Sequence, residues 1–382
     1  MPDLNDLPAL RDASAALTAP LTLSDLLAKT MDLAMQLAGA ERGALALLEK
    51  DGALTVREAR NIAMDEAASQ IEAVRGRTRG QRGANPIAPA GSGSDKMLAA
   101  SLWARGRQAG FLCLFRSGMS ADFTNQDALR VEVIANHAAS AIDAAVAKGE
   151  FVTTVTHELR LPMTSIKGYT DLLRGGMVGA VTDQQKNLLE TVRNNVDWMN
   201  NLISDLGDIS KLDTGRLKVD MDLVDVASAV QQAVNGLRLQ VEVKGQTLTA
   251  NMPALPKVRA DASRLTQIAS CLLTNACRYT PANGRITLSA ETINQTIRIS
   301  VADTGLGIAN DDRAKLFTPF FRSEDAAVRE HKGWGLALHL AKRLAELFGG
   351  EMGVETQLGK GSTFWFTLPV VDEKAVGTPS GQ

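Results

Sequence analysis

The chain has 382 residues, of which 45% are hydrophobic, so it is long enough for two or three domains with substantial cores. Its formal net charge is only -2, which argues against a partner bound by overall charge, and we expect no nucleic-acid partner. Three cysteines without metal-like spacing predict reduced thiols in a cytoplasmic protein.

The sequence shows neither the pattern of a secretory signal peptide nor that of a membrane-spanning helix. The amino-terminal segment has no basic stretch followed by an apolar core, which a secretory signal peptide requires. No run of about 18 uninterrupted apolar residues occurs, so we expect no membrane span.

The first third of the chain predicts a small α/β domain. Residues 1–19 are rich in Ala, Pro and Asp, and we expect them to be disordered. Ser24 is expected to cap a helix that runs to Leu37. The pattern then predicts strands at 43–48 and 53–59 joined by an Asp-Gly hairpin turn, a helix at 64–74, a disordered loop at 76–95, and strands at 97–104 and 109–116.

A long helix follows, and it carries one notable histidine. Thr124 is expected to cap it, and an apolar heptad series beginning at Val131 continues in register through Val152 and Val155. His157 then falls at position f, which is furthest from the helix seam. The series predicts a rigid connection and a histidine held toward solvent. Taken by itself, such a histidine is an ordinary surface residue.

Pro162 is expected to interrupt this helix one turn after His157. A proline inside a helix removes a backbone donor and leaves the carbonyl of Glu158 without its partner, at a cost of about 3 kcal/mol. The expected seam of this helix continues through Leu159, Ile166, Tyr169 and Leu173.

A second heptad helix predicts a helical hairpin over residues 148–218. Thr182 and Gln185 form a capping-box pair at its start. A hairpin cannot bury its seam on every side by itself, so we expect two chains to pair as a homodimeric four-helix bundle. The expected seam residues of the second helix are Leu189, Val192, Val196, Met199, Ile203 and Leu206.

Residues 219–371 alternate between strand and helix patterns, which predicts an α/β sandwich. The tail at 372–382 is expected to be disordered. The expected helices lie at 225–239, 262–279 and 336–348, and the expected strands at 247–250, 258–260, 285–290, 296–302, 350–356 and 362–370.

Two clusters in this last region point to a nucleotide. Helical spacing puts Asn275 and Arg278 on one face, where an amide oxygen suits Mg²⁺ and a guanidinium suits phosphate. Asp303 ends an expected strand ahead of Gly305 and Gly307, and its carboxylate can accept from the amino group of adenine. Each cluster alone also fits an ordinary helix end or turn.

Two glycine pairs add to this pattern. Gly333 and Gly335 precede an expected helix, whose backbone N–H groups favour phosphate. Gly359 and Gly361 form a turn ahead of the last strand.

Together these motifs resemble the sensor histidine kinases of two-component systems. The chain from about 151 to 370 contains HELRLP, a second heptad helix and the four clusters in that family's order. It resembles a HisKA dimerisation and phosphotransfer hairpin followed by a GHKL-type ATP-binding domain (HATPase). Residues 20–147, with AERGALALLEKDGAL, resemble a GAF sensor domain whose ligand-facing middle is short.

The resemblance implies which residues act. His157 would accept the phosphoryl group, and Glu158 would draw its proton, although helix neighbours at i and i+1 do not face each other. Asn275 would bind Mg²⁺, Asp303 would bind adenine, and a lid from about 316 to Gly335 would cover ATP. The remaining implied ATP-binding residues are Arg278, Tyr279, Gly305, Gly307, Gly333, Gly335, Gly359, Gly361 and Thr363, the last in the adenine pocket.

Three positions depart from the family pattern. Cys271 replaces an asparagine one turn before Asn275, Ala337 replaces the third glycine after the lid, and Leu161 replaces a polar residue four positions after His157. The implied activity is a homodimeric ATP-dependent kinase that passes phosphate to a receiver domain of a separate response regulator. The alternative is a nucleotide-binding pseudokinase scaffold acting through dimer contacts. Another GHKL ATPase, such as a chaperone, lacks the histidine hairpin.

Overall fold

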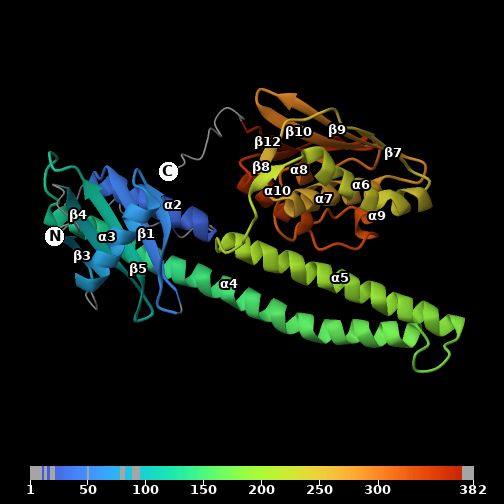
Figure 1. The fold of residues 1–382 in the computed structure, drawn as a ribbon, viewed down its shortest axis with the longest axis horizontal. Coiled ribbons are helices and arrows are strands. Elements are labelled where there is room, and N and C mark those ends of the chain that lie inside the picture. The colour runs from blue at the N-terminus through green and yellow to red at the C-terminus, as the bar shows by residue number, and fades with distance from the viewer. Residues whose placement is uncertain are drawn as a thin grey trace, which may run out of the picture. The chain divides into compact units, whose positions relative to one another are not determined.

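The computed structural model describes residues 11–12, 15–17, 22–49, 51–77, 82–87 and 95–371. The chain divides into two compact units, residues 1–155 with 210–216, and residues 156–209 with 217–382 (Figure 1). The expected disorder at 372–382 and over most of 1–19 lies outside the described residues. It is wrong at residues 15–17, which are helical and bury Leu17. No helix in the described ranges is long and apolar enough to cross a bilayer.

The first unit is built on an antiparallel sheet of five strands in the order β2-β1-β5-β4-β3. The hairpin of β1 and β2 and the pairing of β4 with β5 confirm the expected strand pattern. Its elements are α2 (Leu23–Ala38), β1 (Arg42–Leu48), β2 (Leu54–Arg60), α3 (Met64–Arg77), β3 (Ala84–Ile87), β4 (Lys96–Ala104), β5 (Arg107–Arg116) and the start of α4 (Asn125–Arg174).

Two expectations in this unit are corrected. Thr22, not Ser24, caps α2, because its hydroxyl accepts from the backbone N–H of Asp25. The expected loop at 76–95 contains β3, a short edge strand that pairs with β4. Thr124 caps α4 as expected, since its hydroxyl accepts from the N–H of Asp127.

Helices cover both faces of this sheet. The apolar side chains of α2 and α4, such as Met31 and Ile134, pack on one face. Ile71 of α3 packs on the other face against Phe111 and Cys113, all of them buried. Burial raises the pKa of the Cys113 thiol to about 12, so this side chain behaves as a small apolar group. The face under α3 is therefore filled by the protein's own side chains.

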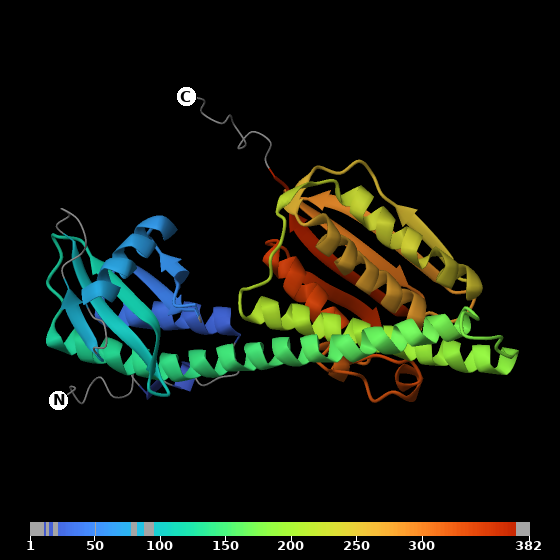
Figure 2. The ribbon, with the colours of Figure 1, turned by 60° about the horizontal axis from the view of Figure 1, so that its bottom comes forward.

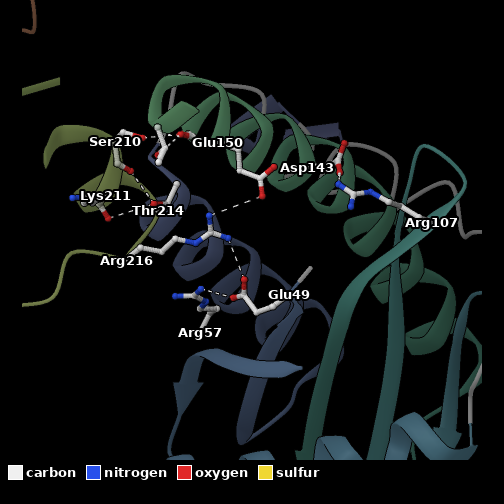
Figure 3. A network of polar contacts seen from close by, with 11 residues as sticks. Glu49, Arg57, Arg107, Asp143, Glu150, Ser210, Lys211, Thr214 and Arg216 are labelled. Carbon is white, nitrogen blue, oxygen red and sulfur yellow. Dashed lines mark hydrogen bonds and ion pairs between the residues drawn. The ribbon is translucent and has the colours of Figure 1, made fainter. Parts of the chain in front are cut away.

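The carboxyl end of α5 (Asp183–Asp213) belongs to this first unit. The Ser210 hydroxyl donates to the carbonyl of Gly149 on α4 at 2.9 Å. Glu49, directly after β1, accepts hydrogen bonds from Arg57 at 2.5 Å and from Arg216 at 3.1 Å (Figure 3). The β1–β2 hairpin is thereby tied to the residues that follow α5.

Pro162 does not interrupt α4, contrary to expectation. The helix runs unbroken from Asn125 to Arg174 with Pro162 inside it. His157 lies in this continuous stretch with its side chain 70% exposed, so the expected outward position is confirmed.

The two helices of the hairpin pack through two of the expected α5 residues, Val196 and Ile203, but on α4 through a residue that was not expected. Met163 of α4 is buried against Val196 and Ile203 of α5. Thr156 and Thr170, seven positions to either side of Met163, are buried as well. The expected α4 face, Leu159, Ile166, Tyr169 and Leu173, is exposed, as are Leu188, Val192 and Met199 of α5. The capping box at the start of α5 is confirmed, since Thr182 and Gln185 exchange hydrogen bonds.

Residues 219–371 form the expected α/β sandwich. A mixed sheet in the order β11-β12-β10-β9-β7 carries α6, α7 and α10 on one face (Figure 2). The strands β6 and β8 form a separate two-stranded sheet, and of these two strands only β8 was expected. The elements are β6 (Asp222–Val224), α6 (Val226–Val243), β7 (Thr247–Asn251), β8 (Val258–Ala260), α7 (Ala262–Tyr279), β9 (Arg285–Ile293), β10 (Thr296–Asp303), α8 (Asn310–Arg313), α9 (Ala326–Arg329), α10 (Ala337–Leu347), β11 (Met352–Gln357) and β12 (Gly361–Pro369).

Candidate functional site

His157 and Glu158 are adjacent exposed residues on α4. The Nδ1 atom of His157 lies 3.6 Å from Oε1 of Glu158, and both side chains are 70% exposed. This distance is longer than a hydrogen bond, yet it brings the carboxylate to the ring more closely than helix geometry alone predicts. A carboxylate in this place can take a proton from the imidazole.

Helix α7 carries Asn275 and Arg278 to one end of the sandwich. Asp261 caps the helix by accepting from the backbone N–H groups of Ser263 and Arg264. One turn before Asn275, Cys271 lies 4.0 Å from its amide nitrogen. Burial, and then the nearby carboxylate of Asp205, raise the pKa of the Cys271 thiol to about 12. Cys271 is therefore a neutral thiol when no metal is bound, and a sulfur atom is a poor ligand for Mg²⁺, which prefers oxygen.

Asp303 ends β10 with its carboxylate fixed by two backbone donors. Oδ1 accepts from the N–H of Gly305 at 2.8 Å and from the N–H of Ser362 at 3.3 Å. Burial raises the pKa of Asp303, while these two hydrogen bonds act in the opposite direction. Because both bonds go to Oδ1, Oδ2 is the oxygen that can accept from a bound base.

The loop glycines bring these segments together. Gly307 has a φ of 66°, and a Cβ there would lie 2.0 Å from the carbonyl oxygen of Gln357. Gly361 has a φ of 107°, and a Cβ there would lie 1.9 Å from the carbonyl oxygen of Asp303. Any larger residue at either position would push the loop after β10 away from the turn between β11 and β12.

The other predicted glycines lie around the same point. A Cβ on Gly305 would meet the carbonyl oxygen of Tyr279, one on Gly335 would meet that of Phe321, and Gly359 donates its N–H to Leu306 at 2.7 Å. Gly333 approaches the guanidinium of Arg278, with 3.3 Å between its would-be Cβ and Nη1. The structure thus assembles the end of α7, the end of β10, the lid and the last turn into one cluster.

Thr363 lies one residue away from the position opposite Asp303 on the neighbouring strand. In the antiparallel register, Thr363 pairs with Ala302, while Ser362 pairs with Asp303. Neighbouring residues on a strand point to opposite faces, so Ser362 shares the face of Asp303 and Thr363 takes the other. Ser362 is the residue that the sequence reasoning missed. The alternation of Phe364, Phe366 and Leu368, which are buried, could have identified it.

His331 of the lid lies over the end of α7. Its ring meets that of Tyr279 edge to face, with 5.4 Å between centroids. Partial burial, followed by the nearby cations Lys244 and Arg278, lowers the pKa of His331. Several cations therefore converge here, an arrangement that suits an anionic phosphate chain.

The residues present fit a magnesium ion that is shared with a nucleotide. The described residues contain no group of three acidic, histidine or cysteine side chains that could hold a metal alone. Mg²⁺ commonly takes one or two protein oxygens and completes its shell with phosphates and water. The Asn275 amide is a suitable single oxygen ligand for that arrangement.

The first turn of α7, at the opposite end of the helix from Asn275, also contacts the hairpin. Arg264 of α7 pairs with Asp208 of α5, with 2.5 Å between Nη1 and Oδ2. One turn earlier on α5, burial and then the Asp208 charge raise the pKa of Asp205 to about 6.

Three family models match the chain in sequence. They are a GAF domain at residues 22–144, the His Kinase A (phospho-acceptor) domain at 147–215, and the histidine kinase-, DNA gyrase B- and HSP90-like ATPase at 260–372. These ranges agree with the resemblance found in the motifs.

Individual relatives agree as well. The histidine protein kinase DivJ of Caulobacter vibrioides is 35% identical over 228 residues, covering 59% of this chain and 38% of that protein. The circadian input-output histidine kinase CikA of Synechococcus elongatus is 31% identical, covering 63% of this chain and 32% of its own length. The chain therefore spans less than half of the length of the curated relatives that it matches.

One solved structure shares the fold over a similar range. The crystal structure of full-length ShkA in complex with AMPPNP has a TM-score of 0.50 and 30% sequence identity. The match covers 58% of this chain and 45% of ShkA.

Proposed function

Because the chain belongs to the sensor histidine kinases of two-component systems, we propose that it phosphorylates His157 from Mg²⁺-ATP. The phosphoryl group then passes to an aspartate in the receiver domain of a separate response regulator. One observation carries this proposal. An exposed histidine lies in the phospho-acceptor match, and a half-buried carboxylate with its glycine cluster lies in the ATPase match.

The chain's own residues divide the work. The Oδ2 atom of Asp303 accepts from the adenine amino group, Arg278 and the backbone around Gly333 and Gly335 hold the phosphates, and Asn275 gives Mg²⁺ an oxygen. Bound Mg²⁺ neutralises charge on the phosphates. Tyr279, whose ring packs edge to face against that of His331, lines the phosphate side of the proposed site.

His157 is the nucleophile in this proposal. Glu158 takes the imidazole proton on the Nδ1 side, and the other ring nitrogen attacks the γ-phosphorus. A P–N bond forms, the bond from the γ-phosphorus to the bridging oxygen breaks, and ADP leaves. Stabilisation of the charge that develops on the phosphates, together with positioning, supplies most of the rate enhancement.

The proposal includes a homodimer and a cytoplasmic location. The exposed apolar side chains Leu159, Ile166, Tyr169 and Leu173 form a face on α4 that a second copy of the hairpin would cover. ATP is the proposed phosphoryl donor, which supports placing the catalytic part in the cytoplasm.

A pseudokinase scaffold is the second candidate, and Cys271 and Ala337 favour it. A neutral thiol at 271 removes one polar ligand from the helix that carries Asn275. Incubation of the full chain with γ-labelled ATP separates the two candidates. The kinase should acquire an acid-labile, alkali-stable label and lose it to a receiver domain. A scaffold would bind nucleotide, or none, without labelling.

A further inference from the structure

Trp334 of the lid stacks on Trp198 of α5. The ring centroids are 4.6 Å apart and the planes differ by 20°. Next to the stack, Lys332 donates to the amide oxygen of Asn195 at 2.9 Å, and its ammonium lies 5.8 Å from the Trp198 ring centroid. Trp334 stands between the two glycines Gly333 and Gly335, so the stack joins the loop proposed to bind phosphate directly to the hairpin.

A second contact fixes how α7 runs along the hairpin. Its first turn meets α5 through the ion pair between Arg264 and Asp208. Further along, Cys271 of α7 lies near Asp205, which is earlier on α5. The two helices therefore run antiparallel, and the end of α7 with Asn275 points toward the lower numbers of α5, where Trp198 lies.

The register of the hairpin relates these contacts to His157. It places Asp208 at the level of His157 and Trp198 near the level of residue 166. Trp198 is thus roughly nine residues away from His157 along the helices, or about 13 Å at the rise of an α-helix. Three ion pairs set this register: Lys167–Asp197, Asp171–Arg193 and Arg174–Glu190.

We propose that Trp198 and Trp334 are positioning residues that hold the ATP-binding domain at a resting position along α5, called here the resting register. In this register the loop with Gly333 and Gly335 lies at the level of Trp198, about 13 Å along the hairpin from His157. This inference rests on the proposed kinase function. In-line transfer requires the reacting atoms to approach to about 3–3.5 Å, so the lid must move along the hairpin before the γ-phosphoryl group can reach the imidazole. The stack must part in that movement.

The stack sets how often the productive register forms. Aromatic pairs contribute about 0.5–1.5 kcal/mol beyond their burial, which corresponds to about a 2- to 12-fold bias toward the resting register. Loss of either ring should therefore raise the rate of His157 phosphorylation by a factor in this range. Nucleotide binding should stay unchanged when the Trp198 ring is lost, because Trp198 lies on α5, outside the nucleotide cluster.

The experiment uses the full chain and compares Trp198→Ala, Trp334→Ala and the double variant. For each, the initial rate of His157 labelling is measured against ATP concentration, and the affinity for a non-hydrolysable ATP analogue is measured by calorimetry. We expect kcat to rise about 2- to 12-fold in each single variant, and in Trp198→Ala the KM and the analogue Kd should stay within twofold of the parent. The double variant should not exceed either single variant, because both remove the same interaction.

Two further variants keep the result interpretable. Trp198→Phe retains an aromatic stack and should keep the parental rate, which separates the loss of the stack from other effects of the substitution. Trp103→Ala removes a partly buried tryptophan from β4 of the first unit and should leave the rate unchanged.

Unchanged or lower kcat in both alanine variants, with normal analogue binding, would overturn the resting register. A parent chain that binds the analogue but never labels His157 would instead refute the proposed kinase. The two failures are therefore distinguishable.

Discussion

The carboxylate of Asp303 accepts the backbone N–H of Gly305, with 2.8 Å between Oδ1 and the nitrogen. The bond fixes one oxygen of a half-buried acid and leaves the other available to a bound base. Asp303 thus connects the end of β10 to the glycine loop after it, and its second oxygen is the proposed contact with adenine.

Replacement of Asp303 by Asn should weaken ATP binding while the fold is kept. The amide presents either a donor or an acceptor to the adenine amino group, and the donor would leave that group without a partner. We expect the affinity to fall by about 1–3 kcal/mol, the range for an unsatisfied buried polar group. Calorimetry on the full chain measures this, with Asp311→Asn on the exposed helix α8 as the control. An unchanged Kd for ATP would remove Asp303 from the site.

Asp205→Asn should stabilise the protein above about pH 6 and have no effect below about pH 4. The folded pKa of Asp205 is raised to about 6 from an ordinary value of 3.8, so the parent loses stability as pH rises through about 6. The amide removes this loss, by about 1–2 kcal/mol after allowance for solvent screening. Below about pH 4 the carboxyl is protonated in both states and the variant should match the parent. Thermal unfolding at pH 4, 6 and 8 measures the trend, and a gain of equal size at every pH would contradict it.

Tyr169→Glu should disrupt the proposed dimer. Tyr169 is 69% exposed on the apolar face of α4, where a second hairpin would bury it. A buried, unpaired carboxylate is costly, so the variant should shift toward monomer in sedimentation at micromolar concentration. Leu239→Glu on α6, where the side chain is 72% exposed, is the matched control and should remain dimeric. If the parent sediments as a monomer, the dimer is refuted.

Leu161 predicts little phosphatase activity toward the response regulator. The resemblance assigns that reaction to a polar side chain four positions after the histidine, which orients the attacking water. Leu161 is 57% exposed there and has neither donor nor acceptor. Purified phospho-regulator mixed with this protein and ADP should lose phosphate no faster than alone, and Leu161→Thr should accelerate the loss. Rapid loss with the parent chain would show this prediction wrong.

Local patterns predicted much of this molecule. The capping box of Thr182 and Gln185 and the outward position of His157 depend on residues within a few helical turns, and both are confirmed. The continuity of α4 through Pro162 could not be predicted, since local propensity there favours a break.

Pairings between distant segments were the harder part. The alternation along β12 indicates the face that Ser362 takes, but its position opposite Asp303 depends on the register of β10 and β12. The seam through Met163 depends on how α5 packs across α4. The stack of Trp198 and Trp334 joins segments far apart in the chain, and neither residue has a local signal for it.

The central claim is that His157 alone carries the phosphoryl group, and one substitution tests it most directly. His157→Gln in the full chain, incubated with γ-labelled ATP, should give no acid-labile label while it binds ATP with parental affinity. His137→Gln is the matched control, because His137 is an exposed histidine on the same helix α4, and this variant should label normally. Label that persists in His157→Gln would contradict the account.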